Sequence, residues 1–449
     1  MEIRTQKEAE DLIYQSYLRA INNISESLDE KVKKPELTRK LLDLIGSPDR
    51  GQKYILVTGS KGKGSTSRFI SSLLAHLGYK VGLFTSPHLV NFNERIRING
   101  KAISEKDFVR ISNLIEPQVS KIEKDLNSDQ YQGPVGIALS TAVTYFKENK
   151  TDINVIEIGR GGLYDDTNVL ENDWAVITPI MKEHTNSLGS SINEIVIHKL
   201  GIIKKNTKSV YISRQENEVM AQIQNSHLLK NTKNRYYKED FLANNIEMTE
   251  KGTSFEVNTK RDKYSNLSIP LLGEFQAINA AVAIQFCEDF VGGKIDQSIV
   301  NKCFSSIQWP GRSEIVSHNP TVIVDGAINE FSANYLKNVI KVIGSDCRIA
   351  SIIGVPKDKD YRGVINVLND VSNQMILTKP DVSHLIFPED ALKYAKSLNA
   401  NSLEFPYLND SLKYAKDVLK ADLILIVGTQ TLIGNAKRIM GHSLLDIGK

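Results

Sequence analysis

The chain alternates short apolar runs with stretches in which apolar residues recur at helical spacing. Residues 6–46 carry that spacing twice, which predicts two helices near the start. An apolar run at 54–58, helical spacing over 66–77 and another apolar run at 80–84 predict a strand, a helix and a strand. This order is typical of a βαβ unit with parallel strands.

The same alternation continues further along the chain. Apolar runs predict strands at 153–158, 174–178 and 208–212, and periodic stretches predict helices near 105–125, 137–148, 192–203 and 275–290. A polar, strand-rich stretch near 235–270 is expected to complete this part. The repeated order of strand, helix and strand predicts an α/β fold with a doubly wound, mostly parallel sheet.

Trp309-Pro310-Gly311 interrupts this pattern and marks the expected domain boundary. Beyond it, four apolar runs predict strands, at 321–325, 348–353, 374–378 and 423–427. We therefore expect an N-terminal domain over residues 1–311 and a smaller, Rossmann-like C-terminal α/β domain over residues 312–449.

Composition narrows the class of protein without fixing its function. A net charge of +3 over 449 residues gives no reason to expect nucleic acid as a partner. No apolar run approaches the length that spans a bilayer, and the charged, amphipathic start is unlike a secretory signal. Cys287, Cys303 and Cys347 lie far apart, which suggests reduced thiols. We expect a cytoplasmic monomer with no membrane partner.

The most informative segment is VTGSKGKGST at 57–66, between a predicted strand and a predicted helix. Its three glycines, Gly59, Gly62 and Gly64, allow a tight turn that no side chain obstructs. Backbone N–H groups and the positive end of the helix dipole would then face an anion. The layout predicts a phosphate cradle, the alternative being a glycine-rich turn that binds nothing.

The polar side chains of this segment fit the same hypothesis. Lys63 adds a charge for the outer phosphates, and Ser65 or Thr66 can hold a phosphate oxygen or magnesium. The spacing differs from an ordinary P-loop, because only two residues separate Gly59 from Gly62 and Gly64 follows the lysine directly. A simple P-loop NTPase or kinase is therefore the weaker hypothesis.

Further polar residues follow predicted strands, where the ligand crevice of a parallel sheet lies. Ser86 follows strand 80–84, Glu157 ends strand 153–158, and His184 comes after strand 174–178. Ser86 and Glu157 offer the oxygen ligands that magnesium prefers. By themselves a Ser-Pro turn, a strand-capping carboxylate, a structural histidine and a surface lysine at Lys199 are equally ordinary. Convergence on one crevice is what would make them a site.

The C-terminal half contributes two more candidates. Asp325 ends strand 321–325, and Arg312 lies in the interdomain segment. An arginine there could reach phosphates when the domains close, because its guanidinium can contact a phosphate through two hydrogen bonds at once. A hinge ion pair is the alternative role for Arg312.

These motifs together resemble the folylpolyglutamate synthase and dihydrofolate synthase family, within the Mur ligase superfamily. GSKGKGST is similar to that family's GTNGKGS loop, residues 84–103 to its most distinctive segment, and EIGRGGLYDDTNVL at 157–170 to its E-x-G-L-G-G-R-x-D-A-T-N pattern. Other matches follow in family order, at 183–189, 198–204, 273–284, 311–314, 325–329, 354–360 and 427–434. The resemblance covers nearly the whole chain and implies Mur ligase architecture.

The resemblance implies an ATP-dependent ligase. The carboxylate of a folate-type acceptor is phosphorylated to an acyl phosphate, and the amine of glutamate displaces the phosphate to form an amide. By similarity, Lys63 and the 62–66 backbone hold the phosphates of ATP, and three residues hold the nucleotide from across the cleft: Asn279, Arg312 and Asp325. The second domain is then expected to close on ATP.

The resemblance also implies a metal site. Ser86, Glu157 and His184 match the family's magnesium ligands, and Lys199 matches a lysine that becomes carbamylated, which turns a cation into a carboxylate-like ligand. Lys63, Lys199 and Arg312 are the expected catalytic residues. Mg²⁺ is the expected cofactor.

The chain departs from the family pattern at several places. Ile328 stands where the family has a histidine, and Glu183 where it has an aspartate. Leu163 stands where the family has an arginine, and Arg160 occurs three residues earlier. Val135-Gly136 replaces an aromatic–Glu pair, and residues 35–48 replace a G-L-E-R-I stretch. They lie away from the metal ligands, so they leave the acceptor open between a folate and another carboxylate of a specialised pathway. A third hypothesis, an inactive nucleotide-binding regulator, is disfavoured because the metal set is complete.

Overall fold

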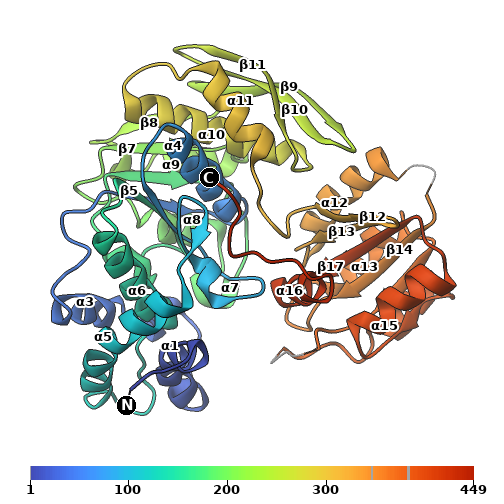
Figure 1. The fold of residues 1–449 in the computed structure, drawn as a ribbon, viewed down its shortest axis with the longest axis horizontal. Coiled ribbons are helices and arrows are strands. Elements are labelled where there is room, and N and C mark those ends of the chain that lie inside the picture. Colours follow the sequence, from blue (N-terminus) through green and yellow to red (C-terminus); the bar gives the residue numbers. More distant parts are fainter. Residues whose placement is uncertain (1, 345–346, 382–384) are drawn as a thin grey trace.

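A computed structural model describes residues 2–344, 347–381 and 385–449. Its strands form three sheets (Figure 1). The first has the order β4-β3-β2-β5-β1-β6-β7-β8 and is parallel except at β3 and β4. Its strands are β1 (Tyr54–Thr58), β2 (Val81–Phe84), β3 (Ile96–Ile98), β4 (Lys101–Ala102), β5 (Ile153–Glu157), β6 (Trp174–Ile177), β7 (Ser209–Ile212) and β8 (Lys233–Tyr236). The predicted doubly wound parallel sheet is confirmed.

Helices cover both faces of this sheet because successive strand side chains point to opposite sides. On β1, Ile55 and Val57 pack on one face while Tyr54 and Leu56 pack on the other. The first face is covered by α4 (Lys63–His76), α10 (Glu274–Val291) and α11 (Gln297–Ser306). The other is covered by α1 (Gln6–Ala20), α3 (Pro35–Leu44), α5 (Glu105–Glu123), α6 (Pro134–Glu148), α8 (Ile192–Leu200) and α9 (Asn217–Gln224). Short helices α2 (Asp29–Val32) and α7 (Thr185–Leu188) lie in the connections.

The polar, strand-rich stretch forms a separate antiparallel sheet. It consists of β9 (Phe241–Thr249), β10 (Gly252–Thr259) and β11 (Lys263–Ile269). One side packs on α10 while the other is exposed, which explains the alternation of apolar and polar residues. The sequence analysis did not identify α11, which follows this sheet and α10.

The third sheet builds the second domain, with the order β12-β13-β17-β14-β15-β16. Its strands are β12 (Glu314–His318), β13 (Thr321–Asp325), β14 (Ile349–Gly354), β15 (Gln374–Leu377), β16 (Leu403–Glu404) and β17 (Leu423–Gly428). Only β12 is antiparallel to its neighbour. Its helices are α12 (Glu330–Ile343), α13 (Tyr361–Asn369), α14 (Ala391–Leu398), α15 (Leu408–Lys413) and α16 (Gln430–Ile439).

The chain crosses between the two domains twice. It leaves the first domain after α11, and the segment after α16 returns to it, where Ala102 N–H donates to Leu445 O at 2.7 Å (Figure 1). The division at 311 and 312 stays a prediction: the third sheet starts at Glu314, yet residues 444–449 lie on the first domain. No helix in the described ranges has the length and apolar character to cross a membrane.

Candidate active site

The segment between β1 and α4 has the backbone of a phosphate cradle. Gly59 and Gly62 have φ of +142° and +84°, and a Cβ at Gly59 would lie 1.9 Å from Thr178 Oγ1. Gly62 is the residue before α4, whose first N–H groups therefore lack intrahelical partners. These N–H groups and the helix dipole favour an anion at this point.

Two side chains join the cradle to its surroundings. Lys63 Nζ donates to Gly59 O at 3.1 Å, so its ammonium lies across the loop. Thr66 Oγ1 donates to Asn279 Oδ1 at 3.2 Å, and a Cβ at Gly62 would lie 2.9 Å from that same oxygen. Asn279 of α10 is thus adjacent to the cradle within the first domain, and does not approach it from across the cleft as expected. Its contact with the nucleotide stays a prediction. Ser65 is buried in the first turn of α4.

Ser86 and Glu157 meet at the carboxyl ends of the neighbouring strands β2 and β5. Ser86 N–H donates to Glu157 Oε2 at 3.1 Å. A Cβ at Gly64 would lie 3.3 Å from Glu157 Oε2, so the carboxylate is directly beside the cradle. Burial raises the pKa of Glu157, against the opposing charges of Lys63 and Arg312.

Lys199 contacts the cradle loop from α8. Its ammonium is 1 % exposed and donates to Gly59 O at 2.9 Å and to Glu183 Oε1 at 3.1 Å. Burial, reinforced by the charge of Lys63, lowers the pKa of Lys199 to about 8. His184 follows Glu183 with φ of +49° at the start of α7, and burial lowers the pKa of this imidazole too.

Arg312 and Asp325 approach from the second domain. Asp325 Oδ2 accepts hydrogen bonds from both the N–H and the hydroxyl of Ser313, each at 2.8 Å. Burial lowers the pKa of Arg312, while the carboxylates of Asp325 and Glu157 act against that shift. The carboxylates that act on Arg312 come from both domains, and Arg312 lines a cavity of about 30 Å³ together with residues of the loop after β2.

The donor set fits a magnesium ion. In the described part of the chain no group of three or more His, Cys, Asp or Glu side chains forms a complete metal site. The Glu157 carboxylate is buried, the charges of Lys63, Arg312 and Arg95 act on it, and it accepts a hydrogen bond from the main-chain N–H of Ser86. Magnesium commonly binds to one or two protein oxygens and completes its shell with water and substrate phosphates, which matches this arrangement.

Arg95 is a neighbour of the site that the sequence analysis did not single out. Its Nε donates to His88 Nδ1 at 2.9 Å, and its charge opposes the raised pKa of Glu157. The segment 84–103 was recognised as distinctive, but nothing in its spacing separates this arginine from Arg97. Only the folded hairpin shows which of the two faces the carboxylate.

Some of the departures from the family pattern, at Arg160, Gly136 and Thr38 of the segment 35–48, come together near the loop that follows β5. Arg160 is paired with Asp29, and Lys33 lies 3.3 Å from Asp29 and 3.4 Å from Asp165. Further contacts join Thr38 to Asp166 at 2.8 Å and bring Thr38 against Gly136. Residues from three separate departures thus form one buried polar cluster. Leu163 is 40 % exposed, and Ile328 packs on the core of the second domain.

Asp166 makes this cluster sensitive to pH. Burial and the neighbouring Asp165 raise the pKa of Asp166 from 3.8 to about 6. A raised carboxyl pKa means that stability is lost as pH rises from about 4 to about 6. Asp166→Asn should therefore raise the free energy of unfolding at pH 8 by up to about 3 kcal/mol, and by less at pH 4.5. Urea unfolding at both pH values checks this, and a loss of stability at pH 8, or the same change at both pH values, would contradict it.

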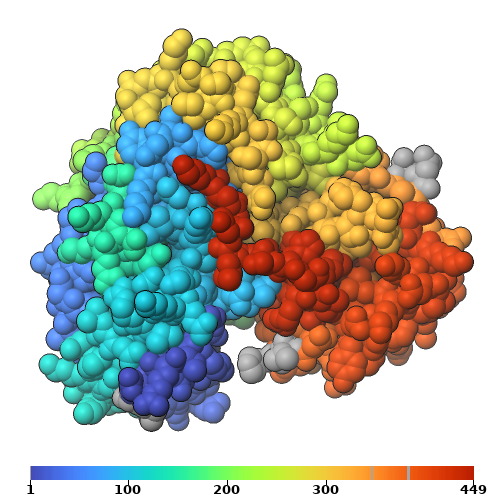
Figure 2. Space-filling model, viewed as in Figure 1, coloured from blue at the N-terminus to red at the C-terminus, as the bar shows by residue number. Residues whose placement is uncertain are grey.

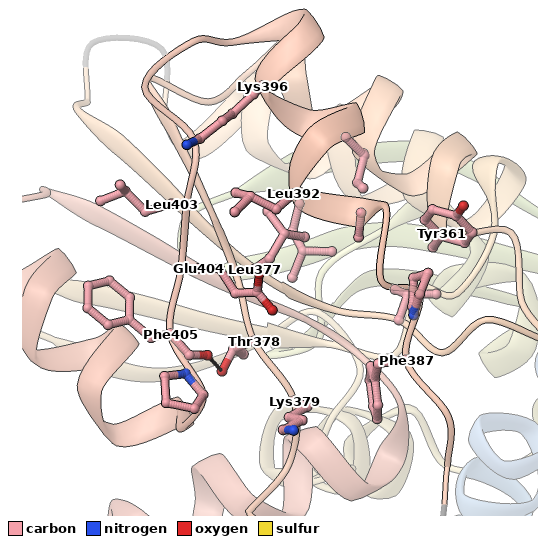
Figure 3. A pocket seen from close by; sticks show the side chains of 16 residues that line it. Tyr361, Leu377, Thr378, Lys379, Phe387, Leu392, Lys396, Leu403, Glu404 and Phe405 are labelled. Carbon is pink, nitrogen blue, oxygen red and sulfur yellow. Dashed lines mark hydrogen bonds between the residues drawn. The ribbon is translucent and has the colours of Figure 1, made fainter.

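A separate hollow of about 540 Å³ lies at the carboxyl ends of β14, β15 and β16 (Figure 3). Its wall includes Leu377, Phe387 and Phe405, with Lys379 at its edge, and Thr378 Oγ1 donates to Phe405 O at 3.0 Å. All its lining residues belong to the second domain, and none belongs to the cradle.

Known proteins with similar sequences point to the same kind of nucleotide-binding ligase. Residues 57–287 match the Mur ligase middle domain. The dihydrofolate synthase/folylpolyglutamate synthase of Bacillus subtilis is 30 % identical over 415 residues, covering 90 % of this chain and 95 % of the relative. That of Mycobacterium tuberculosis is 31 % identical over 443 residues, covering 91 % and 90 %.

A solved structure supports the same relationship. The Mycobacterium tuberculosis folylpolyglutamate synthase complexed with ADP and AMPPCP superposes with a TM-score of 0.86 at 26 % identity, covering 98 % of this chain and 99 % of that one. The fold and the cradle therefore define an ATP-dependent ligase of the Mur ligase type. Within that class, the chain belongs to the family of folylpolyglutamate and dihydrofolate synthases.

Proposed function

We propose that this enzyme joins the amino group of L-glutamate to the carboxylate of a folate, with conversion of ATP to ADP and phosphate. The observation that supports it most is the convergence of cradle, carboxylate and cations at the rim of the first sheet: Lys63, Glu157, Lys199 and Arg312. The names of the relatives, dihydrofolate synthase and folylpolyglutamate synthase, supply the substrate class.

The nucleotide would occupy the crevice between the domains. The N–H groups of residues 62–66 and Lys63 hold its phosphates, and Asn279 contributes from α10. Arg312 and Asp325 hold it from the second domain. Because the charges of Asp325 and Glu157 both act on Arg312, closure of the second domain would place the guanidinium on a phosphate.

The chemistry has two steps. A carboxylate oxygen of the acceptor attacks the γ-phosphorus, the bond to the β-phosphate oxygen breaks, and ADP leaves an acyl phosphate. The neutral amine of glutamate then attacks the acyl carbon and expels inorganic phosphate, and the amine loses a proton as the amide forms. Lys63 and Arg312 offset the charge on the transferring phosphoryl group, which is the main demand of such a step.

We assign the metal to Ser86, Glu157 and His184, while Lys199 lies against the cradle loop through Gly59 O and Glu183. A bound Mg²⁺ would supply Lewis-acid neutralisation of phosphate charge. The depressed pKa of Lys199 leaves part of its amine neutral near pH 8, which is the form that reacts with CO₂ to give a carbamate and a proton. The carbamate would place a second anionic ligand near the cradle.

A second candidate is ligation of a carboxylate other than a folate. The polar cluster around Asp29, Lys33, Arg160 and Asp166 favours it, because it brings together Arg160 and, through Asp166, Thr38 of the segment 35–48, two places where the chain departs from the family pattern. Under this alternative the nucleotide chemistry is unchanged and only the acceptor differs.

An acceptor screen separates the two candidates. With ATP, Mg²⁺ and glutamate, dihydropteroate or tetrahydrofolate should each be tested for a product heavier by one glutamyl residue, detected by mass spectrometry. We expect phosphate release only when carboxylate and amine are both present. Release that ignores the acceptor would contradict ligation, and ligation of other carboxylates without any folate product would favour the second candidate.

A further inference from the structure

One face of the phosphate-binding helix α4 holds both segments that cross between the domains. Gly64, Arg68 and Ser72 are spaced four residues apart and so lie along one side of the helix. Gly64 is in the cradle, and Arg68 is the largest fully buried side chain of the described residues. Each of the three contacts a residue of a crossing segment.

The outgoing segment lies along this face. Arg68 Nε donates to Gln308 O at 3.0 Å. The next residue, Trp309, lies over Gly64, where a Cβ would be 3.1 Å from Trp309 Cζ2. Arg312 follows three residues later, so the contacts of Gln308 and Trp309 set where the arginine enters the crevice.

The returning segment is held by the same guanidinium. Arg68 Nη2 donates to Ile447 O at 2.9 Å, Gly448 O at 3.1 Å and Lys449 O at 3.0 Å, and Ser72 Oγ donates to Lys449 O at 2.8 Å. Figure 2 shows this segment, in dark red, lying on the first domain beside α4. Ile447 is 1 % exposed, so the contact is a packed one.

Arg68 forms no ion pair with an Asp or Glu side chain within the described ranges; its hydrogen bonds go to main-chain oxygens of residues 308 and 447–449. A guanidinium with rigid, forked donors can bind two segments at once, which a lysine ammonium cannot do with the same geometry. A buried charge is costly to leave without the hydrogen-bond acceptors that surround it. Both crossings are therefore needed for the arginine to remain where it is.

We propose that Arg68 is a positioning residue for ATP binding: it fixes the segments 308–312 and 444–449 on α4 and thereby sets the position of Arg312 over the cradle. The proposal rests on the assignment of Arg312 to the nucleotide. Under this proposal, both segments that cross between the domains are bound to the same helix, α4. Movement of the second domain then takes place about a fixed pair of attachments.

Arg97 provides a matched control. This buried arginine also donates to main-chain carbonyls of the returning segment, Leu444 O at 2.7 Å and Leu445 O at 3.4 Å, but in the described ranges it donates no hydrogen bond to the outgoing one. Arg68→Met removes the hold on both crossings, while Arg97→Met removes a hold on the returning segment alone. Loss of a general structural contact should affect both variants alike.

The test measures ATP binding without any acceptor. Trp174 and Trp309 are the two tryptophans of the chain, so Trp174→Phe leaves Trp309 as a reporter at the cradle. In that background we expect Arg68→Met to raise the Kd for ATP about ten-fold or more and to diminish the change in Trp309 fluorescence. Arg97→Met should lower Tm but change the Kd by less than about three-fold.

Arg68→Lys keeps the experiment decisive if the methionine variant does not fold. Lysine can reach one segment but not both, so its Kd for ATP should lie between wild type and the expected Arg68→Met value, with a lower kcat than wild type. Wild-type ATP binding in Arg68→Lys, or equal effects of Arg68→Met and Arg97→Met, would overturn the proposal. A wild-type chain that binds no ATP would instead overturn the proposed function, before any variant is compared.

Discussion

Glu157→Gln is expected to abolish ligation while the protein remains folded. Glutamine keeps the shape of the side chain and can still accept the hydrogen bond from Ser86 N–H, but it removes the charge that a metal requires. Loss of metal-assisted charge neutralisation should lower kcat by about a thousand-fold or more, which corresponds to about 4 kcal/mol of transition-state stabilisation. Single-turnover formation of the acyl phosphate at saturating Mg²⁺ measures this effect.

The thermal stability of Glu157→Gln, unlike its activity, should stay unchanged or increase. Burial raises the pKa of Glu157, so ionising it in the folded protein is unfavourable, and the neutral isostere avoids that cost. The same raised pKa predicts that wild-type activity falls as pH is lowered, starting at a higher pH than for an exposed glutamate. Thermal unfolding in the absence of nucleotide should show an unchanged or higher Tm for Glu157→Gln.

Glu288→Gln is the matched control. Glu288 is a fully buried carboxylate of α10 whose pKa is also raised by burial, and it accepts hydrogen bonds from Tyr264 and Thr259. This variant should affect stability and leave kcat near wild type. Full activity of Glu157→Gln, or an equal loss in Glu288→Gln, would show that Glu157 does not hold the metal.

The parallel strands could be predicted from sequence because their signals are local. Runs such as YILV at 54–57 and INVIEI at 153–158 are apolar on both sides of the strand, as a sheet covered by helices on both faces requires. Their carboxyl ends then had to share one edge, which is why Ser86 and Glu157 could be expected to meet. In the structure Ser86 N lies 3.1 Å from Glu157 Oε2, so these two strand ends do lie together.

Contacts between distant segments could not be predicted in the same way. Arg68 follows the cradle motif but looks like any polar residue on a helix, and its partners near 308 and 447 lie 240 or more residues away. The ion pair of Arg160 with Asp29 could not be predicted either, since each residue alone looks like an ordinary charged residue. Such pairs depend on the packing of whole elements, which no local periodicity encodes.

Lys199→Ala is expected to cause the second large loss, with kcat lowered by about a hundred-fold or more, in line with removal of a metal ligand or its orienting partner. The neutral amine needed for a carbamate becomes more abundant as pH rises through the Lys199 pKa of about 8. ¹³C-labelled bicarbonate should therefore give a carbamate NMR signal that grows between pH 7 and pH 9. Formate or acetate should restore part of the activity of Lys199→Ala by occupying the vacated space.

Lys204→Ala separates carbamylation from simple burial. Lys204 is another lysine whose pKa burial lowers to about 8, but it donates to the carbonyls of Asn168 and Leu170, away from the cradle. Its loss should lower Tm and keep both the carbamate signal and the activity. If wild type shows no carbamate and carboxylates do not rescue Lys199→Ala, the lysine acts as a cation. Its 3.1 Å contact with Glu183 would then orient the loop that carries His184.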